Sequence, residues 1–180
     1  ECLSISIPAV YRHREKNRAN LIHRDPEVTE AEFLCREQGC LFEVLNFKQG
    51  LDPLLFLDIR SGRRHLSRIC KDRSVLNLFA YTCAAGVIAA SSSASSVINI
   101  DFSETWLGHG RQNAKHNDIS KNKCRFIHDD CISVIRQFAG LPMKGRAVRR
   151  GFKKYQKQSF DIIFLDPPTF SKGRFGAVDI

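Results

Sequence analysis

Three carboxylates closely follow short apolar runs of this 180-residue chain, in positions where a folded protein can use them. They are Asp101, Asp130 and Asp166, and the runs before them cover residues 97–100, 125–128 and 160–165. An acid at the end of a buried strand can accept hydrogen bonds from the hydroxyl or amino groups of a nucleoside. Because parallel strands end at the same edge of a sheet, this spacing predicts one site built from several strand ends.

The segment that begins at Asp166 has the sharpest chemical pattern in the chain. Pro167 and Pro168 fix the backbone after an apolar run and can hold the acid on a rigid shelf. Phe170 can stack on an unpaired base, a contact worth roughly 1–3 kcal/mol. The competing interpretation is a strand that is merely stopped by prolines. We predict that these four residues line a catalytic pocket.

Asp101 and Asp130 are predicted to bind different parts of a nucleoside cofactor. Asp101 can accept hydrogen bonds from both ribose hydroxyls, whereas the alternative is an acid that stabilises a helix N-terminus. Ser103 already supplies that helix with a cap, which favours the ligand role for Asp101. Asp129 and Asp130 are adjacent and cannot both point at one ligand. Asp130 directly precedes an apolar helix, so we assign the adenine amino group to it.

Strands alternate with helices from residue 74 onward, which predicts an α/β fold with a Rossmann-like, doubly wound parallel sheet. The short turn at residues 80–86 is rich in small side chains and can bring backbone N–H groups close to a ligand, or can simply start a helix. It lacks Gly-x-Gly-x-x-Gly, which argues against a nicotinamide-dependent oxidoreductase. The predicted strands are 75–80, 97–100, 125–128 and 160–165, and the predicted helices are 84–90, 104–117 and 132–138.

The chain before this region divides into two parts. Residues 1–32 are a polar lead-in, expected to be extended or loosely helical. Residues 33–70 are expected to hold a β-hairpin and a connecting helix, and residues 71–180 the main domain. Within the first 70 residues the pattern predicts a helix at 29–37, hairpin strands at 40–47 and 54–58, and a helix at 63–69.

Composition limits the partners and the compartment. The net charge of +9 favours polyanions, and no apolar stretch approaches the roughly 20 residues that span a membrane. The seven cysteines include no Cys-x-x-Cys and no zinc spacing, so we expect no metal site and a reducing intracellular compartment. That compartment is the cytoplasm, or an organelle if a targeting segment precedes Glu1, which is not a methionine.

A basic segment between residues 140 and 160 contains no acid. Phe152 and Tyr155 are interleaved with its cations, a pattern typical of a loop that contacts RNA, although a solvated insertion would have a similar composition. The cations are Lys144, Arg146, Arg149, Arg150, Lys153, Lys154 and Lys157.

Four of these motifs together resemble those of the bacterial large-subunit ribosomal RNA methyltransferases, of the cytosine-C5 and guanine-N7 types. The motifs are VLNLFAYT at residues 75–82, Asp101, Asp130-Cys131, and LDPPTFS at residues 165–171. The stretch FLDIRSGR at residues 56–63 is similar to the family's Phe-x-Asp-x-Arg-x-x-Arg element. The resemblance covers roughly residues 33–176. It implies a Rossmann-like fold, S-adenosylmethionine as methyl donor and structured RNA as substrate.

The resemblance also assigns roles to residues. It places Asp166, Pro167, Pro168 and Phe170 in the catalytic pocket. It implies cofactor contacts for Phe56, Arg60, Phe79, Tyr81, Thr82, Asp101 and Asp130, with Asp166 beside them.

The chain departs from the family pattern at three places. Cys83 stands where members usually have Gly, and Pro53-Leu54 replaces a usual Thr-Gly. Full members continue beyond the position of Ile180 with three more strands, so we expect a truncated sheet whose exposed edge could self-associate.

The resulting hypothesis is methyl transfer to a nucleobase of RNA, in which Asp166 orients the base and Phe170 stacks on it. Cytosine-C5 methylation needs a cysteine nucleophile, which could come from the C-terminal strands of full members, because both Cys83 and Cys131 lie in cofactor motifs. The target base therefore stays open, and Thr169-Phe170-Ser171 resembles the guanine-modifying relative more. The alternative is a non-catalytic RNA-binding protein derived from a methyltransferase.

Overall fold

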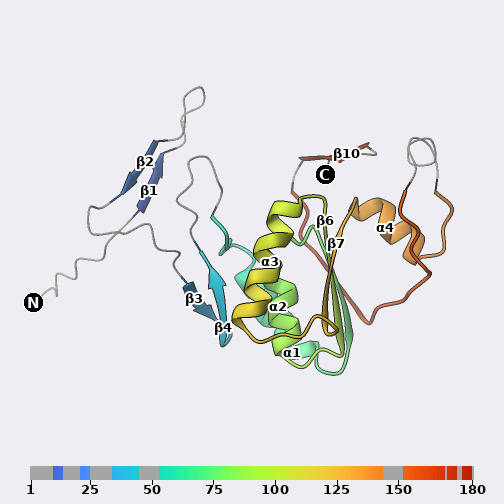
Figure 1. Cartoon of the computed structure of the whole chain (residues 1–180), viewed down its shortest axis with the longest axis horizontal. Helices are drawn as coiled ribbons and strands as arrows, with labels where there is room; N and C mark the ends of the chain where they lie inside the picture. The colour runs from blue at the N-terminus through green and yellow to red at the C-terminus, as the bar shows by residue number, and fades with distance from the viewer. Residues whose placement is uncertain are drawn as a thin grey trace, which may run out of the picture.

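In the computed structural model of the protein, a parallel four-stranded sheet forms the centre (Figure 1). The structure describes residues 10–13, 21–24, 34–44, 53–143, 152–168, 170–173 and 176–179. The strands lie in the order β7-β6-β5-β8. They are β5 (Ser74–Leu78), β6 (Ser96–Asp101), β7 (Cys124–His128) and β8 (Ile162–Leu165). This confirms the predicted α/β fold and the position of all four strands.

Helices cover both faces of this sheet because its strands are apolar on both sides. Val75 packs with α1 (Arg60–Ile69) and α2 (Ala84–Ser91), whereas the next residue, Leu76, packs with α4 (Cys131–Phe138) on the opposite face. Helix α3 (Glu104–His116) contacts β4 and β7. Ser103 caps α3 by accepting a hydrogen bond from Trp106 N, as the sequence predicted.

A row of buried polar side chains crosses the apolar sheet. Asn77 Nδ2 donates to Asn99 Oδ1 at 2.9 Å, and Asn99 Nδ2 donates to Cys124 Sγ at 3.2 Å. Helix α2 passes directly over this row at Gly86, where an added Cβ would lie 1.9 Å from Asn99 Oδ1. The row therefore needs both a partner for each amide and a glycine above it.

A β-hairpin precedes the main domain, as predicted, but only its second strand, β4, lies within a predicted strand, at residues 40–47. Leu34–Glu37, expected to be helical, forms β3 and pairs with β4 (Cys40–Glu43). Gln38 and Gly39 both have positive φ, 50° and 81°, which makes a two-residue hairpin turn. The prediction of a strand at 54–58 is wrong, because residues 53–59 contain no strand. The predicted helix at 63–69 begins earlier, at Arg60.

Polar side chains of α3 hold the hairpin to the domain. Asn113 Oδ1 accepts from Glu43 N at 3.0 Å, and Asn117 both accepts from Leu41 N and donates to Leu41 O at 2.8 Å. Glu43 is buried, and its Oε2 lies 2.6 Å from His109 Nδ1. The edge of β4 is thus hydrogen-bonded by a helix face.

Two further hairpins lie near the ends of the chain, and the sequence predicted neither. β1 (Val10–His13) pairs antiparallel with β2 (Leu21–Arg24), within the segment expected to be an extended or loosely helical lead-in. β9 (Phe170–Gly173) pairs antiparallel with β10 (Gly176–Asp179).

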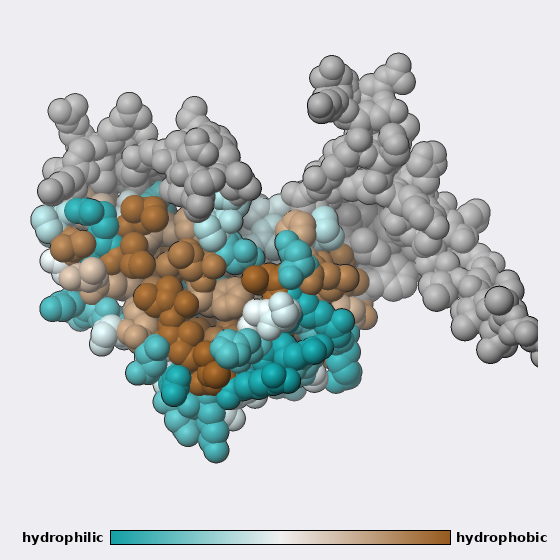
Figure 2. All heavy atoms as spheres, turned by 180° about the vertical axis from the view of Figure 1, so that it is seen from behind, coloured by the Kyte–Doolittle hydropathy of each residue, from teal (hydrophilic) through white to brown (hydrophobic). Residues whose placement is uncertain are grey.

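Strand β8 is exposed on the side of the sheet that α4 covers elsewhere. Ile162 and Phe164 pack toward α1 and α2, whereas Ile163 and Leu165 are 53% and 58% exposed. Figure 2 shows a broad group of apolar side chains on the face opposite to the view of Figure 1. Among the described residues, no helix is long and apolar enough to cross a membrane.

Candidate active site

The loop after β5 has an unusual backbone at the carboxyl edge of the sheet. Phe79, Tyr81 and Cys83 have φ values of 52°, 50° and 61°, in the left-handed region that L-residues rarely adopt. Asp101 Oδ2 accepts from Tyr81 N at 2.8 Å, and Ala80 N donates to the end of β6. The positive φ at Cys83 gives a physical reason for a glycine at this position in the family pattern.

Cys83 is accommodated because α3 approaches it with a glycine. Cys83 is fully buried, and a Cβ added at Gly110 would lie 2.5 Å from Cys83 Sγ. The thiol thus fills the space that a side chain on α3 would need. The loop therefore keeps its shape with a cysteine in place of glycine, at the cost of a close fit to α3.

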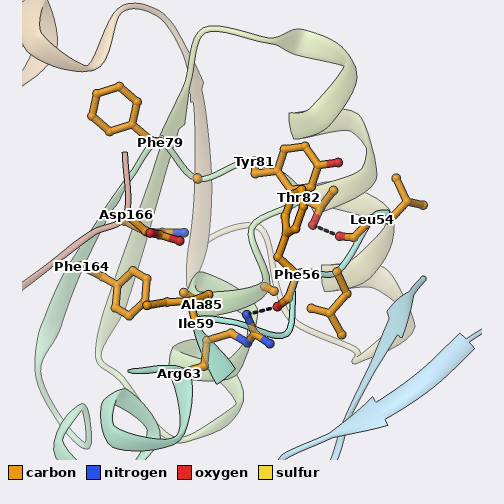
Figure 3. Close-up of a pocket in the computed structure, with 14 residues that line it drawn as sticks. Leu54, Phe56, Ile59, Arg63, Phe79, Tyr81, Thr82, Ala85, Phe164 and Asp166 are labelled. Carbon is orange, nitrogen blue, oxygen red and sulfur yellow. Dashed lines mark hydrogen bonds between the residues drawn. The ribbon is translucent and has the colours of Figure 1, made fainter. Parts of the chain in front are cut away.

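A cavity of about 60 Å³ lies where the carboxyl ends of β5 and β8 meet the segment before α1 (Figure 3). The structure brings five of the predicted site residues to it, from three separate segments of the chain. They are Phe56, Phe79, Tyr81, Thr82 and Asp166. Arg60, Asp101, Asp130, Pro167 and Pro168 do not line it, and the side chain of Phe170 lies outside what the structure describes.

Arg63 is the cavity residue whose role the sequence did not reveal. Its Nε and Nη2 donate to Glu37 Oε1 and Oε2 at 2.7 and 2.9 Å, and its Nη1 donates to Phe56 O at 2.9 Å. Arg63 and Glu37 are only 2% and 4% exposed. Arg60, which was predicted instead, has a half-exposed side chain 3.7 Å from the same carboxylate. Hairpin strand β3 therefore fixes the arginine that faces the cavity.

Asp166 lies at the open side of the cavity (Figure 3). Partial burial raises the pKa of its carboxyl group, the nearby Asp58 raises it further, and Arg63 opposes both effects. Within the described part of the chain, no hydrogen bond to its carboxylate is seen. The binding role of this acid stays a prediction.

Asp101 has a different environment. It is 4% exposed, and its Oδ1 accepts from Ser103 N at 2.9 Å while Oδ2 accepts from Tyr81 N. Burial raises the pKa of this carboxyl group, and the backbone N–H groups oppose that rise. The N–H groups of Tyr81, Phe102 and Ser103 all stabilise the charged form, and the contact of Asp101 with a ribose stays a prediction.

Asp130 caps helix α4. Its Oδ1 accepts from Ser133 N at 2.8 Å, and its Oδ2 accepts no hydrogen bond from the described residues. The neighbouring Asp129 binds Asp130 N through Oδ1 and the hydroxyl of Tyr155 through Oδ2. Asp130 is therefore the acid of this pair that keeps an oxygen available, and its contact with adenine stays a prediction.

Aromatic and hydroxyl contacts tie the loop after β5 to the segment before α1. Thr82 Oγ1 donates to Leu54 O at 2.6 Å, and Tyr81 Oη donates to Pro53 O at 3.0 Å. The Tyr81 ring packs between Phe56 at 5.3 Å and Trp106 at 4.6 Å. Trp106 was not among the predicted site residues. Figure 3 shows Phe56, Tyr81 and Thr82 together above the cavity.

The end of the basic segment lies beside α4. Lys153 Nζ donates to His128 O at 3.2 Å, and Gln137 binds Lys153 O and Tyr155 N. Lys154 and Lys157 are exposed. The remaining predicted RNA contacts, Lys144, Arg146, Arg149 and Arg150, lie outside the described residues.

The cysteines of the described residues are unsuited to act as nucleophiles. Burial raises the pKa of Cys131 to about 12 and that of Cys124 to about 11, and it raises the pKa of Cys83 well above its ordinary value. A thiolate is the reactive form, so these groups stay protonated and inert at neutral pH. No group of three or more potential metal ligands occurs within the same part of the chain.

Comparisons with known proteins agree with this arrangement. A family model described as S-adenosylmethionine-dependent methyltransferase matches residues 9–179. The ribosomal RNA large subunit methyltransferase K/L of Shewanella woodyi is 34% identical over 165 residues, which are 92% of this chain and 20% of that protein. The protein of the same name from Psychrobacter cryohalolentis is 37% identical over 144 residues, which are 79% of this chain and 16% of that protein. The chain thus spans about a fifth of the length of the curated relatives it matches.

Solved structures are similar as well. The crystal structure of SMU.776 complexed with SAH matches with a TM-score of 0.67 at 26% identity, over 89% of this chain and 38% of that one. A SAM-dependent methyltransferase from Agrobacterium tumefaciens shares the fold with a TM-score of 0.71 at 22% identity, over 92% of this chain and 49% of that one. The chain therefore belongs to the S-adenosylmethionine-dependent methyltransferase family, and its cofactor is S-adenosylmethionine.

Proposed function

We propose that this protein transfers the methyl group of S-adenosylmethionine to a nucleobase of RNA, and that the RNA is ribosomal. The observation that carries the proposal is Asp166, an exposed carboxylate with a raised pKa beside the cavity formed at the ends of β5 and β8. Two further findings support an RNA substrate. The curated relatives are named as ribosomal RNA methyltransferases, and the chain has a net charge of +9.

The residues around the cavity fit the cofactor. Arg63 has five N–H donors and uses three of them on Glu37 and Phe56, so two remain for a carboxylate such as that of the methionine part. With the methionine part held at Arg63, the adenosine part would extend along the strand ends toward Asp101 and Asp130.

The cofactor supplies a methyl group on a positively charged sulfur, which is transferred by in-line displacement. The contribution of the protein is to hold a base in that line. Asp166 would accept a hydrogen bond from an N–H group of the base and fix its orientation. Pro167 and Pro168 restrict the backbone that carries this carboxylate, so less freedom is lost when the base binds. A pKa raised toward neutrality also makes Asp166 a better proton acceptor.

The proposed target is a ring nitrogen. Attack on carbon 5 of cytosine needs a cysteine thiolate, and the pKa values of Cys83, Cys124 and Cys131 are all raised by burial. Transfer to a nitrogen of guanine needs no covalent bond to the protein and agrees with the motif at residues 165–171.

Tritium transfer from labelled S-adenosylmethionine to deproteinised large-subunit ribosomal RNA tests the proposal directly. We expect wild-type protein to label the RNA and Asp166→Asn to be slower by about 10²–10³-fold in kcat, as for loss of one charge-stabilising group. Affinity for S-adenosylhomocysteine, measured by calorimetry, should change much less.

The control is Asp72→Asn. Asp72 is an exposed acid in the turn between α1 and β5, at the amino ends of the strands and away from the cavity. It should leave both turnover and cofactor affinity unchanged. RNA binding without any tritium transfer by the wild-type protein would instead identify a non-catalytic RNA-binding protein. Near-normal turnover of Asp166→Asn would remove the role given to this carboxylate.

A further inference from the structure

A second hollow lies far from β8, between α3 and the outer edge of β7. It encloses about 790 Å³, which is much larger than the cavity beside Asp166. Four cations stand around it, and apolar side chains including Ile119 and Phe126 form its floor. The cations are Arg111, Lys115, Lys121 and Arg125, all of them exposed. We call this hollow the β7 groove.

The charge of the β7 groove is strongly one-sided. Asp118 is the acid that lines it, against four cations. Arg111 also forms an ion pair with Glu104 at 2.7 Å, but both side chains are about half exposed. A pair exposed in this way is weak and screened by salt, so Arg111 can exchange its partner for another anion.

The floor of the groove adds a second feature. Arg111 lies over the ring of Phe126, with Cζ 5.7 Å from the ring centre, and the ring itself is only partly buried. A polyanion alone needs the cations but no apolar floor. A nucleotide strand uses both, because its phosphates contact cations while its bases lie on apolar and aromatic surface.

The groove also lies along a strand that ends at the same edge of the sheet as the proposed reaction centre. Strand β7 runs from Cys124, beside the groove, to His128 at the carboxyl edge of the sheet. At about 3.3 Å per residue these ends are about 13 Å apart. Lys153 Nζ binds His128 O, so a cation also stands at the far end of the strand. Cations therefore accompany β7 along its length.

We propose that the β7 groove binds a single-stranded segment of the substrate RNA adjacent to the nucleotide that is methylated. The proposal rests on RNA being the substrate. It adds a binding surface on the opposite edge of the sheet from β8, with its own four cations.

The test is RNA affinity as a function of salt for a variant with Arg111, Lys115, Lys121 and Arg125 all changed to Gln. If the variant loses its contacts to three or four phosphates, fewer counterions are released on binding. The slope of log affinity against log salt should then flatten by about 2–3, and affinity at 0.1 M salt should fall about 100-fold. The matched control changes four exposed cations on and after α1 to Gln. These are Arg64, Arg68, Lys71 and Arg73.

The control removes the same charge from a surface outside the groove. If the groove binds RNA, the control should therefore flatten the slope much less than the groove variant does. Equal effects of the two variants would mean that RNA affinity depends only on net charge, which would overturn the proposal. An RNA affinity and slope that do not change in the groove variant would overturn it as well. Polyglutamate that binds the groove more tightly than RNA would also overturn it and indicate an acidic protein partner. Tritium transfer by the wild-type protein tests the proposed function separately, because it can succeed whether or not the groove binds RNA.

Discussion

The carboxylates at the ends of β6 and β8 are the same residue type in opposite situations. Asp101 is 4% exposed and accepts two backbone N–H groups, whereas Asp166 is exposed beside a cavity and no described residue donates a hydrogen bond to it. Asp101 holds the left-handed backbone of the loop after β5. Asp166 is the acid to which we assign the contact with the substrate. The comparison separates an acid that shapes the loop from one that the described residues leave exposed.

The same contrast divides two arginines of α1, Arg63 and Arg60. Arg63 is buried and bidentate with Glu37, while Arg60 has a half-exposed side chain at a longer distance from that carboxylate. The hairpin side of the cavity is thus rigid before any ligand arrives. Rigid binding groups lower the entropy lost on binding, because only the substrate must still be ordered.

The largest effect on the rigid side should come from Glu37→Ala. This change leaves Arg63 as an uncompensated buried charge and should lower the free energy of unfolding by about 3–5 kcal/mol. Urea denaturation measures it. The control is Glu104→Ala, whose exposed pair with Arg111 should contribute at most about 1 kcal/mol. Equal losses for the two variants would contradict the view that the hairpin fixes the cavity.

Asp101→Ala should have the next largest effect. It removes a charged acceptor from Tyr81 N and Ser103 N, so the free energy of unfolding and S-adenosylhomocysteine binding should each fall by about 1–3 kcal/mol. The comparison variant is Asp130→Ala, which removes a helix cap and should cost about 1 kcal/mol of stability. If Asp101→Ala lowers stability but calorimetry shows unchanged affinity, the acid shapes the loop without binding ribose.

The smallest expected effect concerns Asp166, on the open side of the cavity, and the pH dependence of turnover. The negative charge of Asp58 raises the pKa of Asp166, so Asp58→Asn should lower that pKa. If turnover needs ionised Asp166, activity is lost as pH falls through this pKa, and the variant should keep activity to a lower pH. The pH profile of kcat measures the shift, with Asp72→Asn as the control that should not move it. A shift to higher pH would contradict the assignment.

The sequence predicted the sheet and its helices because each strand is a short apolar run, and because the helices after β6 and β7 have their own caps, Ser103 and Asp130. These are local signals. Strand β3 was missed for the opposite reason. Leu34–Glu37 has no strong periodicity, and the left-handed backbone of Gln38 that forms its turn has no clear signature in a glutamine.

The site was predicted where it depends on strand ends and missed where it depends on distant partners. Asp166 follows its strand directly, so its place at the cavity could be predicted. The importance of Arg63 comes from Glu37, which lies 26 positions away on a strand that was not expected. Likewise, nothing local indicates that Trp106 packs on Tyr81.

The buried amide row also has a consequence for how the sheet assembles. Asn77 lies opposite Asn99 in the register of β5 and β6. If β5 slipped by one residue, Asn77 would face Ile98 or Ile100 and both amides would lose their partner, at about 1–3 kcal/mol for each unpaired group. Apolar side chains alone would tolerate such a slip far better, because both faces of these strands are buried. The pairing of the buried amides therefore selects one register of β5 against β6 from several registers that would bury similar apolar surface.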